Sequence, residues 1–300
     1  MTAKTSKTTY LLIASVPIIW GLTPTVMKTA FDYISPFFMS FLRLTVAFLT
    51  SFVFLYIRGK LNIRDIPSLF RKNLMIIVFF NLFQIFYALG LRILPVGIIG
   101  IVFGLLPVTV LLVNSVMGLE KASSRLIVSV TMSLIGVIII TTAGNATEFD
   151  VIPVQGIVYV FVAQLFYGLF TINSKKNVQT NNPIAITTVA TIPTSIIFFL
   201  WSFEEAVNFN YSTLPIQVWM SIIFSGAIAI SLANSLWIWG ADQIGSNRAS
   251  LYSNLNPVVA LIGGFFIHNE LLNGVQMIGI FVIFTAIILS QIKSKALQIN

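Results

Sequence analysis

The sequence predicts an all-α integral membrane protein with ten transmembrane helices, arranged as two inverted five-helix repeats. Three observations lead to this fold class. Of the 300 residues, 57% are hydrophobic and only 9% are charged; long apolar stretches recur along the chain; and the two halves resemble each other at a nearly constant offset. An average soluble chain carries about 25% charged residues, so this one has too few ions to cover a water-facing surface. A soluble enzyme, a disordered scaffold and a nucleic-acid-binding domain are therefore excluded.

Ten apolar stretches follow one another with short connections between them. A helix needs about 20 mainly apolar residues to cross the hydrocarbon core of a bilayer, and the stretches of about this length are 9–28, 34–57, 73–91, 96–117, 126–143, 153–173, 184–201, 216–239, 248–267 and 273–292. A transmembrane β-barrel does not fit, because barrel strands alternate in hydrophobicity whereas Leu74–Phe80 is an unbroken apolar run. The first stretch is long and contains Pro17 and Trp20. Since no clear small-residue cleavage site follows it, we expect it to be retained as a span and not removed as a signal peptide.

The lysines and arginines are biased to one side of this topology. With the N-terminus in the cytoplasm, fourteen of the 17 fall in cytoplasmic segments, whereas Lys28 and Arg92 fall in outer loops and Arg43 lies inside a span. Cytoplasmic loops of membrane proteins are enriched in Lys and Arg, and an even number of spans returns the C-terminus to the same side. We therefore predict a multi-pass plasma-membrane protein with both termini cytoplasmic, and we attribute the net charge of +8 to orientation rather than to a nucleic-acid partner.

The two halves of the chain share residues that match at a nearly constant offset, and we call these matched residues the repeat ladder. At an offset of 150 the matched residues of the first half are Gly90, Leu105, Pro107, Val108, Leu111 and Glu120, and those of the second half are Gly240, Leu255, Pro257, Val258, Leu261 and Glu270. At an offset of 147, Gly21, Lys28 and Pro36 match Gly168, Lys175 and Pro183. The repeats are predicted at 9–143 and 153–292. Each holds five helices, an odd number, so the second is inverted, and inverted repeats in a short chain are a transporter design.

The same residues resemble a known family. The run from Ile19-Trp20-Gly21 to Lys28, the Phe41-Leu42-Arg43 stretch, and the runs from Leu106-Pro107-Val108 to Glu120 and from Asn256-Pro257-Val258 to Glu270 resemble the EamA-type repeat of the drug/metabolite transporter superfamily. The resemblance implies a ten-helix secondary transporter for small organic solutes, commonly an exporter. The second half departs from the pattern, because Tyr167 replaces the Trp and Ala190 stands where the first half has Arg43.

Polar and aromatic side chains recur at membrane depth, where uncompensated polar groups are costly. Asn81, Gln84 and Tyr87 share one helix face, and their counterparts at offset 150 are Ser231, Asn234 and Trp237. We predict a central pocket of amides, hydroxyls and aromatic rings. Its predicted substrate-binding residues are Trp20, Asn81, Gln84, Tyr87, Gln164, Tyr167, Asn234, Trp237, Tyr252 and Asn256. The alternative is that these side chains bond neighbouring helices to one another.

Arg43 is the one charge well inside a predicted span. It could bind a carboxylate or phosphate through two parallel hydrogen bonds, or it could bond to helix-end carbonyls and hold the repeat together. The family resemblance favours the structural interpretation, because the repeat often carries Arg here across varied substrates.

All nine acids fall at or near predicted helix ends, so no mid-membrane carboxylate is predicted for binding a lipophilic cation or relaying protons. The single histidine, His268, is expected to be solvated.

Pro107 and Pro257 occupy equivalent places in the two halves. Proline removes a helix hydrogen bond and kinks a helix, so we predict a pair of hinges for alternating gates, with static kinks as the alternative.

The chain contains no cysteine, no phosphate-binding loop and no set of catalytic residues. We therefore predict no enzyme activity, no metal and no cofactor. The expected function is secondary transport of a small organic metabolite, neutral or zwitterionic and amino-acid-like, by alternating access. An organic-anion carrier using Arg43, a lipid scramblase or a partner-binding subunit are the alternatives. The expected partners are the small-molecule substrate and the lipid bilayer, with no nucleic acid, and the chain is expected to be a monomer or homodimer.

Overall fold

The computed structural model describes residues 7–28, 30–94, 103–120, 122–142, 153–178, 181–259, 262 and 273–291, and the described residues form helices and turns without a strand. The helices are α1 (Lys7–Lys28), α2 (Pro36–Ile57), α3 (Ile66–Lys72), α4 (Leu74–Leu91), α6 (Leu106–Val116), α7 (Ser124–Thr142), α8 (Val154–Val178), α9 (Pro183–Trp201), α10 (Phe203–Asn208), α11 (Ile216–Ile223), the π-helix η4 (Phe224–Leu232), α12 (Ala233–Ile244), α13 (Ser246–Tyr252) and α15 (Gly274–Gln291). Two short 3₁₀ turns, η1 (Ile63–Asp65) and η3 (Tyr211–Thr213), lie in connections.

The all-helical membrane fold predicted from the sequence is confirmed. Five helical segments of the described chain are long and apolar enough to cross a bilayer: α2, α4, the 154–175 part of α8, α9, and the continuous segment α11–η4–α12. Large apolar side chains remain exposed on the outside of the bundle, including Leu11, Ile57, Val116 and Phe281, which are 72%, 77%, 80% and 72% exposed. Such a surface is stable against lipid but not against water.

The structure differs from three of the predicted spans in where the helix ends, changes type or breaks. The span predicted at 216–239 continues to Ile244, and its middle is a π-helix instead of an α-helix. In the described part of 96–117, a turn at Gly104 and Leu105 precedes α6. In the described part of 248–267, α13 begins at Ser246, a turn follows Tyr252, and helix resumes over residues 255–259. Equivalent helices of the two halves are thus broken at equivalent places, as in the discontinuous helices of transporters.

The repeat reappears in the packing. A Cβ atom on Gly90 would lie 2.3 Å from Val160 Cγ2 of α8, and one on its counterpart Gly240 would lie 2.5 Å from Ile13 Cγ1 of α1. Ile13 and Val160 are themselves related by the offset of 147, so the two halves make the same close helix contact. Only glycine leaves room for the facing side chain at these two places.

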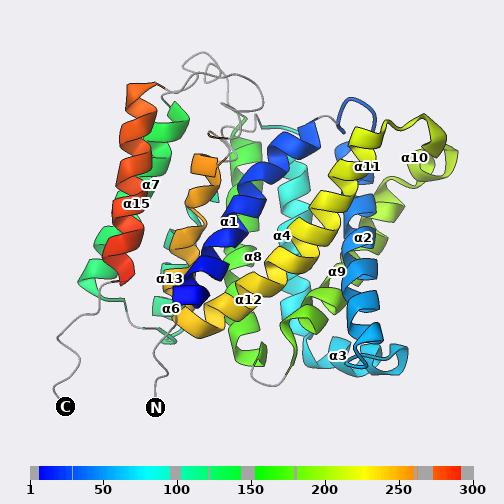
Figure 1. The fold of residues 1–300 in the computed structure, drawn as a ribbon, viewed down its shortest axis with the longest axis horizontal. Helices are drawn as coiled ribbons and strands as arrows, with labels where there is room; N and C mark the ends of the chain where they lie inside the picture. Colours follow the sequence, from blue (N-terminus) through cyan, green and yellow to red (C-terminus); the bar gives the residue numbers. More distant parts are fainter. Residues whose placement is uncertain are drawn as a thin grey trace.

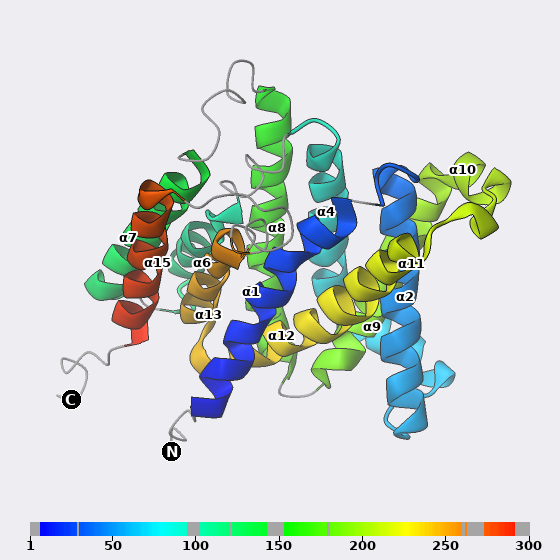
Figure 2. The ribbon, with the colours of Figure 1, turned by 45° about the horizontal axis from the view of Figure 1, so that its top comes forward.

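Equivalent helices also pack in pairs: α2 on α9, and α7 on α15. Figure 1 shows α7 and α15 side by side and antiparallel at one edge of the molecule, with α2 and α9 at the other. Helices α1 and α12 cross in front of α8, a relation that persists in the turned view of Figure 2. We call the side at which α1 begins and α15 ends the termini side.

Candidate functional site

An aromatic and amide cluster forms where α1, α4, α8 and α12 meet, and we call Trp20, Phe83, Tyr167, Asn234 and Trp237 the central cluster. The ring centroid of Trp20 lies 5.2 Å from that of Trp237 and 5.7 Å from that of Tyr167. Phe83 packs 4.6 Å from Tyr167, whose hydroxyl donates a 3.0 Å hydrogen bond to Asn234 Oδ1. Trp20 and Phe83 come from the first half and the other three from the second, so the cluster joins both repeats.

Two hydrogen bonds fix the tryptophans of the central cluster. Trp237 Nε1 donates to Thr171 Oγ1 at 2.9 Å, and Trp20 Nε1 donates to the Ala229 carbonyl at 2.9 Å. Ala229 lies in η4, and π-helical turns occur frequently at functional sites. The central cluster is therefore held in place by α8 and by the irregular turn of the α11–η4–α12 segment.

A second polar group lies beside the central cluster around Arg43, which is 6% exposed. Its Nη1 donates to Met27 Sδ at 3.3 Å and its Nη2 to Gln84 Oε1 at 3.2 Å. Its Nε is buried and has no hydrogen-bond partner among the described residues. Tyr87, which interacts electrostatically with the guanidinium, stacks on Phe83 of the central cluster at 5.9 Å.

Gly226 of η4 permits the close approach of α2 at this point. A Cβ atom there would lie 2.4 Å from the Arg43 carbonyl oxygen.

The remaining predicted binding residues have other surroundings. Asn81 Nδ2 donates to the carbonyls of Ile77 at 2.6 Å and Ala190 at 3.1 Å, so it joins α4 to α9 in the manner of the helix-bonding alternative. Gln164 is buried on α8, one turn before Tyr167, and Tyr252 of α13 belongs to the same hydrophobic core as the central cluster.

Asn256 adjoins the central cluster through its backbone. Its carbonyl oxygen lies against Gly21 of α1, beside Trp20, and its buried Oδ1 has no partner among the described residues.

The two predicted hinge prolines each follow a helix break. Pro107 is the second residue of α6, where a proline removes no helix hydrogen bond, and Pro257 lies in the short helix after the turn at Ser253 and Asn254. The helix breaks are therefore the turns before the prolines, and a hinge at these places stays a prediction. His268 and Glu270 lie outside the described residues.

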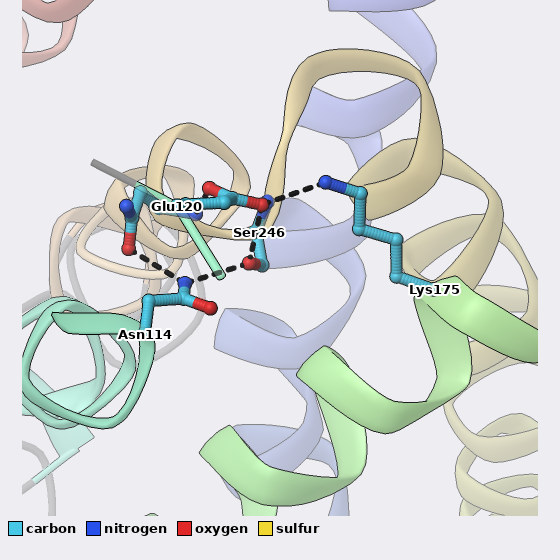
Figure 3. A network of polar contacts seen from close by, with 5 residues as sticks. Asn114, Glu120, Lys175 and Ser246 are labelled. Carbon is cyan, nitrogen blue, oxygen red and sulfur yellow. Dashed lines mark hydrogen bonds and ion pairs between the residues drawn. The ribbon is translucent and has the colours of Figure 1, made fainter. Parts of the chain in front are cut away.

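The sequence did not predict a polar network on the termini side, which we call the Glu120 network (Figure 3). Glu120 Oε1 accepts from Lys175 Nζ at 2.7 Å, from the Ser246 backbone N–H at 2.9 Å and from Ser246 Oγ at 2.8 Å. Its Oε2 accepts from the Asn247 N–H at 3.1 Å, and Asn114 Nδ2 bonds Ser246 Oγ and Asn247 Oδ1 at 2.9 and 2.8 Å. The carboxylate thus joins the connection between α6 and α7 of the first half to α8 and to the first residues of α13.

The electrostatics of the Glu120 network favour an ionised carboxylate. Burial raises the pKa of Glu120, but the hydrogen bonds and charge of Lys175 and the hydrogen bonds of Ser246 together outweigh burial and lower that pKa below its usual value. Gly245 precedes α13 with φ of +87°, a backbone conformation that favours glycine, and its position lies against Glu120.

The only indication of this network in the sequence is that Glu120 and Lys175 both belong to the repeat ladder. No local motif links residues that lie 55 positions apart.

A second bonded carboxylate lies on the opposite side. Glu205 of α10 accepts from the backbone N–H of Ser35 at 2.8 Å and from the Ser35 hydroxyl, at the start of α2. Within the described residues, no three of His, Cys, Asp and Glu come close enough to hold a metal ion.

Comparison with known proteins gives concordant results. The sequence matches the EamA-like transporter family twice, over residues 7–142 and 154–291. A protein of Archaeoglobus fulgidus named an uncharacterized transporter is 23% identical over 91% of this chain and 98% of its own, and the uncharacterized transporter YyaM of Bacillus subtilis is 21% identical over 85% of each chain. A protein of known crystal structure has the same fold, with a TM-score of 0.79 at 16% identity over 96% of this chain and 99% of that one.

Proposed function

Because the chain belongs to the EamA-like transporter family, and is thus a membrane transporter and not an enzyme, we propose that it is a secondary carrier for a small organic metabolite, neutral or zwitterionic and amino-acid-like. It works by alternating access in the plasma membrane, with the termini side facing the cytoplasm. Export is the direction that the family resemblance favours. Whatever the direction of transport, the partners of this transporter are its small-molecule substrate and the surrounding lipid.

The observation that carries this proposal is the central cluster. Its side chains come from both repeats and meet at one point, where Tyr167 bonds Asn234 across two helices and Trp20 packs on Trp237. Substrate sites of repeat transporters lie near the bilayer midplane between the repeats. Aromatic faces bind apolar groups and cations, while the amide and hydroxyl groups bind polar atoms, a combination that suits an amino-acid-like solute.

The Glu120 network supports alternating access, because it joins the two repeats on the termini side. It bonds the connection between α6 and α7 of the first repeat to α8 and to the start of α13, both of the second repeat. We propose that the Glu120–Lys175 contact forms when the cytoplasmic side is closed and breaks when that side opens.

Counterflow in proteoliposomes tests the proposal. Vesicles loaded with one of the protein amino acids, a nucleoside or a sugar are diluted into the same labelled solute, and uptake above protein-free vesicles identifies a substrate. Asn234→Leu removes the acceptor of the Tyr167 hydroxyl and should lower uptake, whereas Asn208→Ala, at the exposed end of α10 outside the central cluster, should leave it unchanged. Lipid scrambling without counterflow of any solute would replace the carrier by the scramblase alternative.

A specific observation also favours the organic-anion alternative. Arg43 is buried, and its Nε–H has no hydrogen-bond partner among the described residues. An anionic group of a solute could accept a hydrogen bond from this Nε–H.

A further inference from the structure

Arg43 is a buried cation without an anionic partner among the described residues. A buried charge is stable only when it is paired or fully hydrogen-bonded. A guanidinium has five N–H hydrogens to donate, and the two bonds recorded for Arg43 go to an amide oxygen and to a thioether sulfur, which is a weak acceptor. The site is therefore electrostatically incomplete.

The acidic residues of the described chain lie elsewhere. Glu120 bonds Lys175, Glu205 bonds Ser35, and Asp65 accepts from the backbone of Asn62. Asp32 and Glu204 are exposed, and Asp242 is at the far end of α12. No described carboxylate contacts Arg43, so the missing anion has to come from outside these residues.

The geometry of the guanidinium matches a carboxylate. The unbonded Nε–H lies on the same planar group as the two Nη atoms, and an Nε–Nη edge binds a carboxylate through two parallel hydrogen bonds. Gln84 Oε1 accepts from Nη2 of the same guanidinium. A Lys at the same place would supply a point charge without the planar fork.

The position of Arg43 connects it with the central cluster. Gln84, which accepts from Arg43, is adjacent in sequence to Phe83, which packs on Tyr167. Tyr87 stacks on Phe83 and contacts Phe103 as well. A solute with its carboxylate on Arg43 therefore places the rest of the molecule against aromatic rings, whose faces attract an ammonium group.

We propose that Arg43 binds the carboxylate of the transported solute, and that the substrate class is an α-amino acid whose other groups lie in the central cluster. This inference rests on the proposed function and deepens it. It also replaces the structural interpretation that the sequence favoured for Arg43. The recorded bonds of Arg43 reach Met27 of α1 and Gln84 of α4, but they leave its buried Nε–H unbonded among the described residues, so helix bonding alone does not satisfy this guanidinium.

The test compares each amino acid with its own amide, which keeps the ammonium and side chain and lacks the carboxylate. The probes are the twenty protein amino acids and the corresponding amino acid amides, and the readout is the shift in the thermal unfolding midpoint of the purified protein across a concentration series. We expect at least one amino acid to bind the wild type about 10- to 100-fold more tightly than its amide, the range for hydrogen bonds to a charged group.

In Arg43→Gln this preference for the acid should disappear while the amide binds as before. A merely structural role would weaken acid and amide equally. The proposal is overturned if no amino acid stabilises the wild type more than its amide, or if Arg43→Gln keeps the preference.

A second variant decides the matter if Arg43→Gln does not fold. Gln84→Glu places a carboxylate where the amide already accepts from Arg43. It should raise the unfolding midpoint of the unliganded protein and abolish the preference for the acid, because the site then holds an internal anion. Gln164→Glu makes the same change at another buried position, where no bond to a cation is recorded, and should lower the midpoint. An unaltered acid preference in Gln84→Glu would exclude the site.

Failure of this inference can be distinguished from failure of the carrier. Counterflow of a nucleoside or a sugar together with no acid preference would retain the carrier and reject the Arg43 site. Absence of counterflow for every amino acid, nucleoside and sugar would reject both.

Discussion

Glu120→Gln is the sharpest test of how the termini side closes, because it keeps the side-chain shape and removes the charge. The native carboxylate accepts four hydrogen bonds, three at Oε1 from Lys175 and Ser246 and one at Oε2 from the Asn247 backbone N–H. A glutamine has one acceptor oxygen. If that oxygen faces Ser246, the NH₂ group faces the N–H of Asn247, and two donors oppose each other.

The magnitude follows from the exposure of the pair. The side chains of Lys175 and Glu120 are 32% and 19% exposed, so the ion pair itself contributes at most about 1 kcal/mol. The lost charge-assisted bond to a backbone N–H adds about 1.5 kcal/mol. With about 0.5 kcal/mol for the ion pair, a total of about 2 kcal/mol shifts the equilibrium between closed and open conformations roughly 30-fold toward the open one.

The assay uses the absence of cysteine from the chain. Ser250→Cys places a reporter one turn beyond Ser246 on α13, and Ser225→Cys places one near α11 in η4; both serines are 0% exposed. A membrane-impermeant maleimide is added from either side of the vesicle. Glu120→Gln should raise the labelling rate of Ser250→Cys from the termini side by up to about 30-fold, while labelling of Ser225→Cys from the opposite side should fall or stay constant.

Two controls make the result specific. Glu205→Gln neutralises a bonded carboxylate on the opposite side and should not increase labelling of Ser250→Cys. Lys175→Met combined with Glu120→Gln should have less than the summed effect, because both remove the same contact. An unchanged labelling rate at Ser250→Cys in folded Glu120→Gln protein would refute the idea that this network closes the termini side.

Three further predictions concern stability. Because the pKa of Glu120 is lowered, its carboxylate stabilises the fold at pH values above the ordinary pKa of 4.5, and this contribution is lost as the pH falls through the lowered value. The unfolding midpoints of wild type and Glu120→Gln should therefore differ at pH 7. They should converge below pH 4.5. Gly240→Ala should cost about 1–3 kcal/mol, because the new Cβ would lie 2.5 Å from Ile13, whereas Gly274→Ala, with nothing within 4 Å, should not lower the midpoint. Asn81→Leu should lower the midpoint by removing the bond to α9 and leave the KM for substrate unchanged; a raised KM with an unchanged midpoint would return Asn81 to the binding site.

The helices could be predicted from the sequence because a helix that crosses a bilayer has a strongly apolar composition. A span must be apolar over its whole length, so α2, α4 and α9 agree with their predicted stretches to within about two residues. The breaks in helices were harder to predict. Pro107 and Pro257 marked their vicinity, but the turns lie at Gly104 and Ser253, because a proline is compatible with the first turn of a new helix and the chain breaks just before it.

Of the candidate site, the sequence predicted the residue types and their depth but not their partners. A side-chain amide at membrane depth must bond something, and periodicity does not say whether that is substrate or the next helix. Asn81 and Gln84 lie on one face of α4, yet Asn81 bonds a backbone carbonyl of α9 and Gln84 bonds Arg43. Long-range pairs such as Glu120 with Lys175 depend on how the two repeats dock, which no local pattern encodes.

The differences between the repeats carry more information about the substrate than their similarity does. Gln84 and Asn234 are equivalent positions, and each accepts one side-chain hydrogen bond, but the donor is Arg43 in the first half and Tyr167 in the second. Ala190 replaces the arginine in the second half, so only one end of the site carries a charge. Two identical halves would present the same groups to both ends of a solute. An unequal pair instead offers a cationic end and an aromatic end, and a molecule with one carboxylate and an apolar remainder then has a single favourable orientation between the repeats.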